Sequence, residues 1–254
     1  IKFVVVPSLT MARKILRFAE FMARERWGRL FKLSTYRIFW RIFLAEKNVS
    51  KIKNQEQEGF VMRYFWKDFL KENFPEARLV YVGHHLAHAS GAYFTSPWND
   101  ALIVTIDGAG NLLTSVVAEG KNGSIRTVAQ TFLPHSVGSF WGSITKVCGF
   151  RSGTRHGGKV TGLAASGDWR KLIDKMRKVI WCQGTRFKVE ESLLFDETEL
   201  VPSWVSYQPE RLKNFLGEAT REDVAAAAQK RLIEVVTELV KNAREKIGQR
   251  KIVV

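Results

Sequence analysis

The stretch from Leu79 to Gly120 contains none of the 40 Lys and Arg residues of this chain. Within it, "DALIVTID" (100–107) is an apolar run with the length of a strand, and it predicts a strand that is buried on both faces. The preceding "RLVYVG" (78–83) predicts another strand, and "HLAHASGAYFTS" (85–96) predicts a helix between the two. This succession indicates a mixed α/β fold.

The elements around this stretch have clear local signals. Residues 112–130 predict a hairpin that turns on Lys121-Asn122-Gly123. A long helix is expected from Thr220 to Lys246, because Thr220-x-x-Asp223 resembles a capping box. Its apolar residues lie on a single face, at positions 224, 228, 232, 235, 239 and 243. Residues 185–218, which include two prolines, predict an irregular excursion.

Both chain ends are apolar and β-branched. "IKFVVVP" and "RKIVV" predict strands, and buried strands need neighbours in a sheet. We therefore expect the chain to be an excerpt from a longer protein.

The net charge of +15 is concentrated near the N-terminus, where residues 1–80 carry 17 Lys and Arg against 8 Asp and Glu. Residues 8–46 and 55–74 predict basic helices, which could pack on a sheet or lie on a membrane surface. Charge alone does not identify a ligand, and we do not expect nucleic acid to be the partner.

With two cysteines, no signal peptide and no long apolar run, we expect a cytoplasmic protein without a transmembrane segment.

Three of the five histidines, His84, His85 and His88, lie in the cation-free stretch. On a helix His84 and His88 are one turn apart on the same face, the spacing with which two imidazoles hold one metal ion. His85 would point about 100° away. The alternative is that all three bind backbone carbonyls at a helix start. The lack of cations favours a metal, because Lys or Arg would repel it.

Asp107 ends the predicted buried strand, and Gly108-Ala109-Gly110 follows it. An acid at a strand exit, followed by glycines whose N–H groups can approach an anion, predicts a corner for metal and phosphate. Asp-Gly is also a common hairpin signal, so a simple β-turn stays open. Together with the two histidines, Asp107 would complete a three-ligand site for iron, manganese or zinc.

Other catalytic motifs are incomplete. The Gly153–Gly167 segment contains G-x-x-x-x-G-K ending at Lys159, but Val160 stands where a P-loop needs Ser or Thr. We expect a glycine-rich basic loop, either near a nucleotide in another fold or packed against the sheet. The chain has no H-E-x-x-H motif, no G-x-S-x-G elbow and no cysteine in an activating context, which leaves a hydrolase without a base or nucleophile.

Three segments, taken in order, resemble the N-terminal domain of the NodU/CmcH family of carbamoyltransferases: "HHLAHASGAYFTSPW", "ALIVTIDGAG" and "SVGSFWGSITKVCGFRSGTRHGGKVTGLAASGD". The family shows H-H-x-A-H-A, a strand ending in D-G-x-G, an S-x-G-x-x-(Y/W) helix start and G-K-V-M-G-L-A, with similar gaps. The resemblance is strong over 79–168 and looser over the long helix and last strand. It implies an α/β fold of the actin/hexokinase-like (ASKHA, ribonuclease H-like) class, incomplete at both ends and related to the tRNA threonylcarbamoyl-transferase proteins.

The resemblance implies an O-carbamoyltransferase. Family members make carbamoyl-adenylate from ATP and carbamoyl phosphate at a separate C-terminal YrdC-like domain. The carbamoyl group then moves to a hydroxyl of a small-molecule or sugar acceptor. By position, His84, His88 and Asp107 would bind Fe2+ or another divalent transition metal, with an Asp from the rest of the protein as fourth ligand.

The resemblance also implies contacts to ATP, which Mg2+ would accompany. The nucleotide-binding residues would be Gly108, Ala109, Gly110, Lys159 and Gly162. His85 would contact substrate or phosphate.

The chain departs from the family pattern near this site. Asn111 replaces a Glu, His156 and Gly157 stand where an acidic residue precedes G-K, and Thr161 replaces Met. These departures predict reduced turnover or a different acceptor, and we expect the excerpt alone to be inactive.

The resemblance divides the chain into a basic helical region (1–78), a metal- and nucleotide-binding core (79–168) and a helical insertion with the long helix and last strand (169–254). A competing hypothesis is a non-catalytic module on a degenerate copy of this fold. It would bind nucleic acid or a membrane surface through the cations of residues 13–41.

Overall fold

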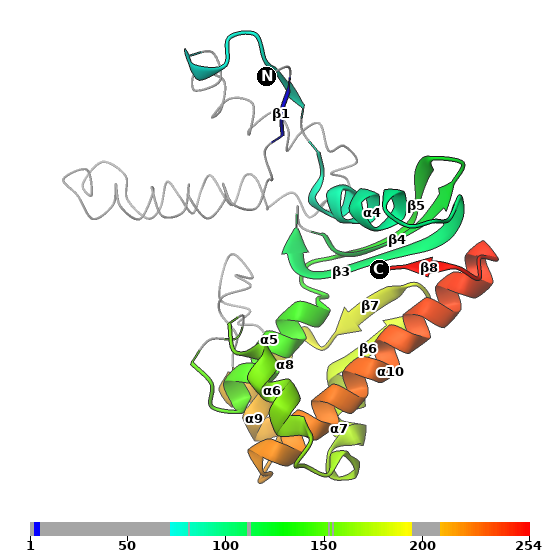
Figure 1. Ribbon diagram of the computed structural model, residues 1–254. Coiled ribbons are helices and arrows are strands. Elements are labelled where there is room, and N and C mark those ends of the chain that lie inside the picture. The colour runs from blue at the N-terminus through cyan, green and yellow to red at the C-terminus, as the bar shows by residue number, and fades with distance from the viewer. Residues whose placement is uncertain are drawn as a thin grey trace. The chain divides into compact units, whose positions relative to one another are not determined.

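The computed structural model describes residues 3–5, 72–80, 82–110, 113–151, 153, 155–194 and 209–254 (Figure 1). Residue contacts divide the chain into two units, 1–87 and 88–254. In the first unit, strand β1 (Phe3–Val5) pairs in parallel with β2 (Arg78–Val80). The two strands predicted from "IKFVVVP" and "RLVYVG" are therefore confirmed.

The basic helix predicted over 8–46, and with it the cations of the competing hypothesis, lies outside the described residues. The same holds for the helix over 55–74, except that residues 72 and 73 are helical. The predicted boundaries after residues 78 and 168 stay predictions. Within the described ranges, no helix combines the length and apolar character needed to cross a bilayer.

The second unit is built on a four-stranded sheet in the order β5–β4–β3–β8. Strands β3 (Asp100–Gly110), β4 (Leu113–Lys121) and β5 (Ser124–Phe132) are antiparallel neighbours, and β8 (Ile252–Val253) runs parallel to β3. The turn between β4 and β5 has φ angles of 48° at Asn122 and 74° at Gly123. Positive angles at both central residues are typical of a type I′ hairpin turn. The predicted hairpin and the mixed α/β class are confirmed.

Helices cover both faces of this sheet (Figure 1). Along β3, successive side chains point to opposite faces. Ala89 and Tyr93 of helix α4 (His84–Phe94) pack on one face, against Ala101, Ile103, Val116, Ala118 and Val253. Helices α5 (Val137–Val147) and α10 (Arg221–Ile247) pack on the other face, in the cluster that contains Leu102, Val104, Val117 and Ala129. Burial on both faces explains why "DALIVTID" is apolar without alternation.

The long helix α10 has the predicted N-cap and, in addition, a glycine C-cap. The Thr220 side chain accepts a hydrogen bond from the Asp223 N–H, and Gly248 follows the last turn with φ 78°. Five of the six predicted apolar positions are buried: Val224, Ala228, Val235, Leu239 and Ala243. The helix predicted over 220–246 is confirmed.

The irregular excursion predicted over 185–218 is wrong where the structure describes it. Strand β7 (Arg186–Val189) pairs antiparallel with β6 (Ile180–Gln183), and helices α8 (Glu191–Leu194) and α9 (Pro209–Leu216) follow. The Phe187 N–H donates to Thr131 Oγ1 at 3.3 Å, which holds the hairpin against β5. Pro209 suggested irregularity, but it is the first residue of α9, where its missing N–H has no cost.

The glycine-rich loop expected within Gly153–Gly167 is also a helix over most of its length, α6 (Gly157–Ala164). Three glycines in eight residues lower helix propensity. Tertiary packing overrides that preference, because Val160 is fully buried in the core shared with α10. A short 3-10 helix η2 (Trp169–Lys171) and helix α7 (Ile173–Val179) complete this layer.

Candidate metal centre

Helix α4 and strand β3 carry the three predicted metal ligands. One ligand atom from each of His84, His88 and Asp107 lies within 4.8 Å of the others. His84 belongs to the last residues of the first unit, but α4 is one continuous helix, so its first turn is placed by the turns that follow. Among the described residues, these three are the His, Cys, Asp and Glu side chains that lie close enough together to hold one metal ion.

His88 and Asp107 form the pair that lies wholly within the second unit. His88 Nε2 is 3.9 Å from Asp107 Oδ2. The other carboxylate oxygen, Oδ1, accepts a hydrogen bond from the Gly108 N–H at 2.6 Å. This bond fixes the rotation of the carboxylate and directs Oδ2 to the histidine. The side chains are 57% and 40% exposed, so an ion can reach them from solvent.

An irregularity in β3 places the Asp107 carboxylate. The pairing with β4 is regular up to Ile106 opposite Ser115 and resumes at Gly110 opposite Leu113. The residues between, Asp107 to Ala109, bulge out of the ladder. Bulges of this kind commonly redirect a side chain next to a functional site.

The start of α5 supports the same bulge from the other side. The Ser136 hydroxyl donates to the Gly108 carbonyl at 2.6 Å and accepts from the Ser139 N–H at 3.0 Å, as the N-cap of α5. At Gly138 a Cβ atom would lie 2.7 Å from Gly108 N, so only glycine permits this approach. Sequence reasoning used S-x-G as part of a resemblance and missed its contact with Gly108. The capping serine before an apolar helix was the available signal.

The donor set fits a divalent transition metal. Two imidazole nitrogens and one carboxylate oxygen are the ligands of many iron, manganese and zinc sites. Ligands bound about 2.0–2.2 Å from one ion stand roughly 3–4 Å apart. The His88–Asp107 pair already has this spacing, and small side-chain rotations would close the rest.

His85 lies next to His84 in the first turn of α4. Its ring contacts the ring of His84 edge-on, with centroids 5.4 Å apart, and the side chain is buried. It does not belong to the three-ligand group. A contact with substrate or phosphate stays a prediction.

The predicted nucleotide-binding residues lie on two elements. Gly108, Ala109 and Gly110 belong to the bulged end of β3. Lys159 and Gly162 lie on α6, both exposed, and the Lys159 ammonium is 5.9 Å from the centre of the Phe150 ring. Helix α6 is tied to α5, because Trp141 Nε1 donates to the Gly157 carbonyl at 3.2 Å. Asn111 lies outside the described residues, and the nucleotide-binding roles stay predictions.

The two cysteines have no features of nucleophiles. Burial raises the pKa of the Cys148 thiol to about 11, and it does the same for Cys182. A thiol with such a pKa is protonated at neutral pH and unreactive. The thiols of Cys148 and Cys182 therefore take no part in the chemistry proposed for this site.

Comparison with known proteins places these residues in a family. The family model described as "Carbamoyltransferase N-terminus" matches residues 18–254. Nodulation protein NolNO of Sinorhizobium fredii is 25% identical over 179 residues, which cover 69% of this chain and 25% of that protein. The uncharacterized Synechocystis protein sll1178 is 30% identical over 96 residues, 38% of this chain and 15% of that protein. The uncharacterized Methanocaldococcus jannaschii protein MJ1051 is 34% identical over 74 residues, 29% of this chain and 14% of that protein. The chain thus spans a quarter or less of the length of these relatives.

Proposed function

The chain belongs to the carbamoyltransferase family, whose N-terminal part it matches, and from this premise we propose that it transfers a carbamoyl group to a hydroxyl-bearing acceptor. The observation that carries the proposal is the convergence of His84, His88 and Asp107. Their ligand atoms come from one helix turn and one strand bulge that the packing of α4 and α5 supports.

The three side chains have separable tasks in this proposal. His88 presents Nε2 toward Asp107, and the Gly108 N–H keeps the carboxylate turned to meet it. A divalent metal held there, Fe2+ or another transition ion, would polarise a carbamoyl or phosphate oxygen and help an attacking hydroxyl to lose its proton. In this proposal the three side chains hold the reacting groups in one orientation and prevent unproductive ones.

The proposed donor is carbamoyl-adenylate, made from ATP and carbamoyl phosphate. In the transfer, the acceptor oxygen bonds to the carbamoyl carbon. The bond from that carbon to the adenylate oxygen breaks, AMP leaves with the electron pair, and the hydroxyl proton passes to solvent. The backbone at Gly108 and Gly110 supports this donor, because glycine lets a phosphate approach closely, and α5 begins beside Gly108.

The fold supports the same proposal. A mixed sheet with helices on both faces fits the actin/hexokinase-like class that we propose for the whole domain. In α/β sheets a carboxylate at the end of a strand is a common place for phosphate and metal chemistry. Asp107 lies at the end of β3, next to the start of α5.

The proposal is tested by the metal dependence of nucleotide binding. Calorimetric titration of the Fe2+-loaded chain with ATP, without oxygen, is compared for the wild type, Asp107→Asn and the control Asp174→Asn, which changes an exposed carboxylate of α7 outside the ligand group. We expect Asp107→Asn to weaken ATP binding by about 10-fold or more, because it removes a charged ligand of similar size. The control should bind like the wild type. Equal affinities in all three proteins, with and without Fe2+, would refute the proposal.

A further inference from the structure

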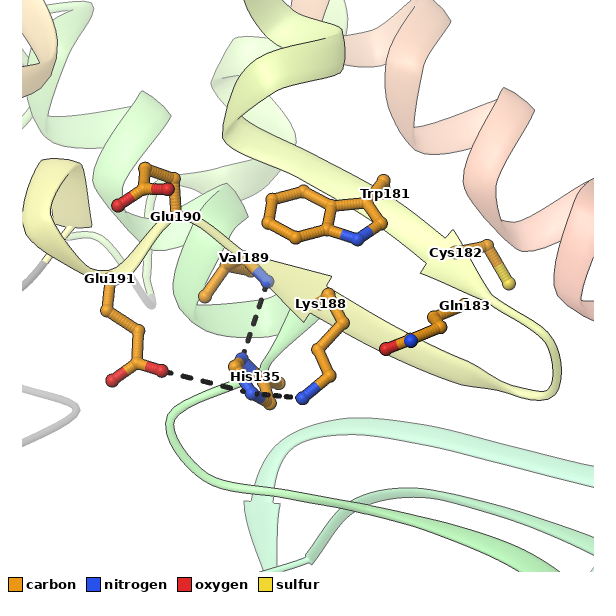
Figure 2. A pocket seen from close by; sticks show the side chains of 8 residues that line it. All are labelled: His135, Trp181, Cys182, Gln183, Lys188, Val189, Glu190 and Glu191. Carbon is orange, nitrogen blue, oxygen red and sulfur yellow. Dashed lines mark hydrogen bonds and ion pairs between the residues drawn. The ribbon is translucent and has the colours of Figure 1, made fainter.

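The loop between β5 and α5 carries His135, a histidine for which no sequence pattern predicts a role. Its side chain borders a cavity of about 490 Å³ that the loop forms with the β6–β7 hairpin and the start of α8 (Figure 2). The dashed lines in Figure 2 converge on its imidazole ring. His135 therefore joins the loop to residues of β7 that lie 53 and 54 positions further along the chain.

Strand β7 and the start of α8 hold the imidazole ring. The Lys188 ammonium lies 2.9 Å from His135 Nε2, and the Val189 backbone nitrogen lies 3.4 Å from Nδ1. The Glu191 carboxylate lies 3.9 Å from Nε2. Burial, and then the charge of Lys188, lower the pKa of His135, so the ring is neutral at neutral pH and can accept from one of the two donors. Contacts at both ring nitrogens fix the orientation of the ring against β7.

The backbone of His135 is held to the central sheet at the same time. The Thr114 hydroxyl of β4 donates to the His135 carbonyl at 2.6 Å. The hairpin also rests on the sheet, because the Arg186 guanidinium of β7 donates to the Gln130 carbonyl of β5 at 3.0 Å. The loop before α5 is thus fixed at two points, by its backbone to β4 and by the imidazole to β7.

The next residue, Ser136, continues this connection to the metal ligand Asp107. The Ser136 hydroxyl donates to the Gly108 carbonyl at 2.6 Å. The Gly108 N–H in turn donates to Asp107 Oδ1 at 2.6 Å. Two neighbouring residues of one short loop therefore contact the β6–β7 hairpin and the ligand bulge, respectively.

The space around this connection leaves little room for the loop to shift. Ser136 is fully buried, and a Cβ atom at Gly138 would lie 2.7 Å from Gly108 N. The bond from Ser136 to Gly108 is at the short end of the O–H···O range of about 2.5–3.0 Å, so a shift of about 0.5 Å would take it beyond that range. Release of the His135 ring would therefore reach the Asp107 carboxylate through Ser136 and Gly108.

We propose that His135 is a positioning residue of the metal centre, because it ties the loop before α5 to the β6–β7 hairpin and so keeps Ser136 in place on the Asp107 bulge. This inference rests on the metal centre of the proposed function. It extends the support of the ligand set to a hairpin that contributes none of the three ligands. Groups that orient a metal ligand change metal affinity without touching the ion.

The test is a double-mutant cycle on the 254-residue chain, with the Kd for Co2+ as the readout, measured by visible absorption. The cycle comprises His135→Ala, Ser136→Ala and the double variant. The control is Gln183→Ala, an exposed residue of the same cavity. We expect each single variant to weaken Co2+ binding by about 10-fold, the lower end of the range for groups that orient a ligand. The control should bind like the wild type.

The double variant separates positioning from a general loss of stability. If His135 acts through Ser136, the double variant should bind Co2+ little more weakly than Ser136→Ala alone. His135→Gln keeps an oxygen that can accept from Lys188, so it should recover most of the affinity that His135→Ala loses. If His135→Ala does not fold, Lys188→Met decides, because it removes one hydrogen bond to the ring and should weaken Co2+ binding by about 3-fold.

Three results would overturn the inference: wild-type affinity in His135→Ala or Lys188→Met, losses that multiply in the double variant, or an equal loss in Gln183→Ala. The wild type distinguishes this failure from failure of the proposed function. A wild-type chain that binds Co2+ as tightly as its His135 variants keeps the proposed function and loses the positioning role. A wild-type chain that binds no Co2+ refutes both.

Discussion

Substituting Gly138 by Ala changes the contact between α5 and the Asp107 bulge by a single methyl group. The new Cβ would lie 2.7 Å from Gly108 N and 3.2 Å from the Asp107 carbonyl carbon. Non-bonded heavy atoms prefer about 3.5–4.0 Å, so helix and bulge must separate by roughly 1 Å. Overpacking of this kind costs about 1–3 kcal/mol of unfolding free energy. Because the Gly108 N–H holds the Asp107 carboxylate in place, metal affinity should also fall, by about 10- to 100-fold, the loss typical of removing a group that orients a metal ligand.

Urea unfolding and competitive metal titration measure the two effects in Gly138→Ala. The control is Gly91→Ala on α4, where a Cβ would meet nothing within 4 Å. Because alanine is favoured over glycine in a helix interior, Gly91→Ala should raise the unfolding free energy by about 0.5–1 kcal/mol and leave metal affinity unchanged. Wild-type stability and metal affinity in Gly138→Ala would refute the claim that α5 supports the ligand bulge.

Three further predictions concern the 88–254 unit. Phe140→Ala removes a fully buried ring and should lower the urea-derived unfolding free energy by about 3–5 kcal/mol, and a loss below about 1 kcal/mol would place the ring outside the core. Thr220→Ala removes the N-cap of α10 and should cost about 1 kcal/mol, whereas Thr220→Ser should cost little; equal losses would exclude a capping role. The pKa of His135 in the folded chain lies below its ordinary 6.5, so protonation of this imidazole favours the unfolded chain. The unfolding free energy should therefore be highest above about pH 6.5 and should decrease as the pH falls below that value. His135→Gln should flatten this part of the stability profile measured by thermal melts, and an unchanged slope would contradict the assignment.

Much of the second unit could be predicted from local patterns. The buried strand β3, the Asn-Gly hairpin and the capped helix α10 have signals within a few residues of one another. Helix α6 and strand β7 were not predicted, because α6 has three glycines and β7 is stabilised by contacts to β5 that are distant in sequence. Tertiary packing decides such segments.

The residues of the candidate site also fall into a group that the sequence predicts and a group that it does not. Spacing on one helix predicted His84 and His88, and a strand exit predicted Asp107. The resemblance to carbamoyltransferases added the family, which is confirmed over residues 18–254. The capping serine Ser136 marks the start of α5 locally, but the approach of Ser136 and Gly138 to Gly108, about 30 residues away, is not encoded by a local pattern.

The cavity around His135 was also beyond sequence reasoning. Its lining residues come together only when a loop, the β6–β7 hairpin and the start of α8 meet. A single histidine in a sequence gives no sign of such a contact. Residues that act together on one helix or strand can be predicted from their spacing, whereas a site built from several distant segments cannot.

The most direct test of the central claim is the metal content of the purified chain, measured by mass spectrometry after equilibration with Fe2+ without oxygen. We predict about one ion per chain in the wild type and in the control His156→Ala, and a loss of bound metal in His88→Ala and Asp107→Ala. Full metal content in both ligand variants would contradict the account, because the ion would then be bound elsewhere.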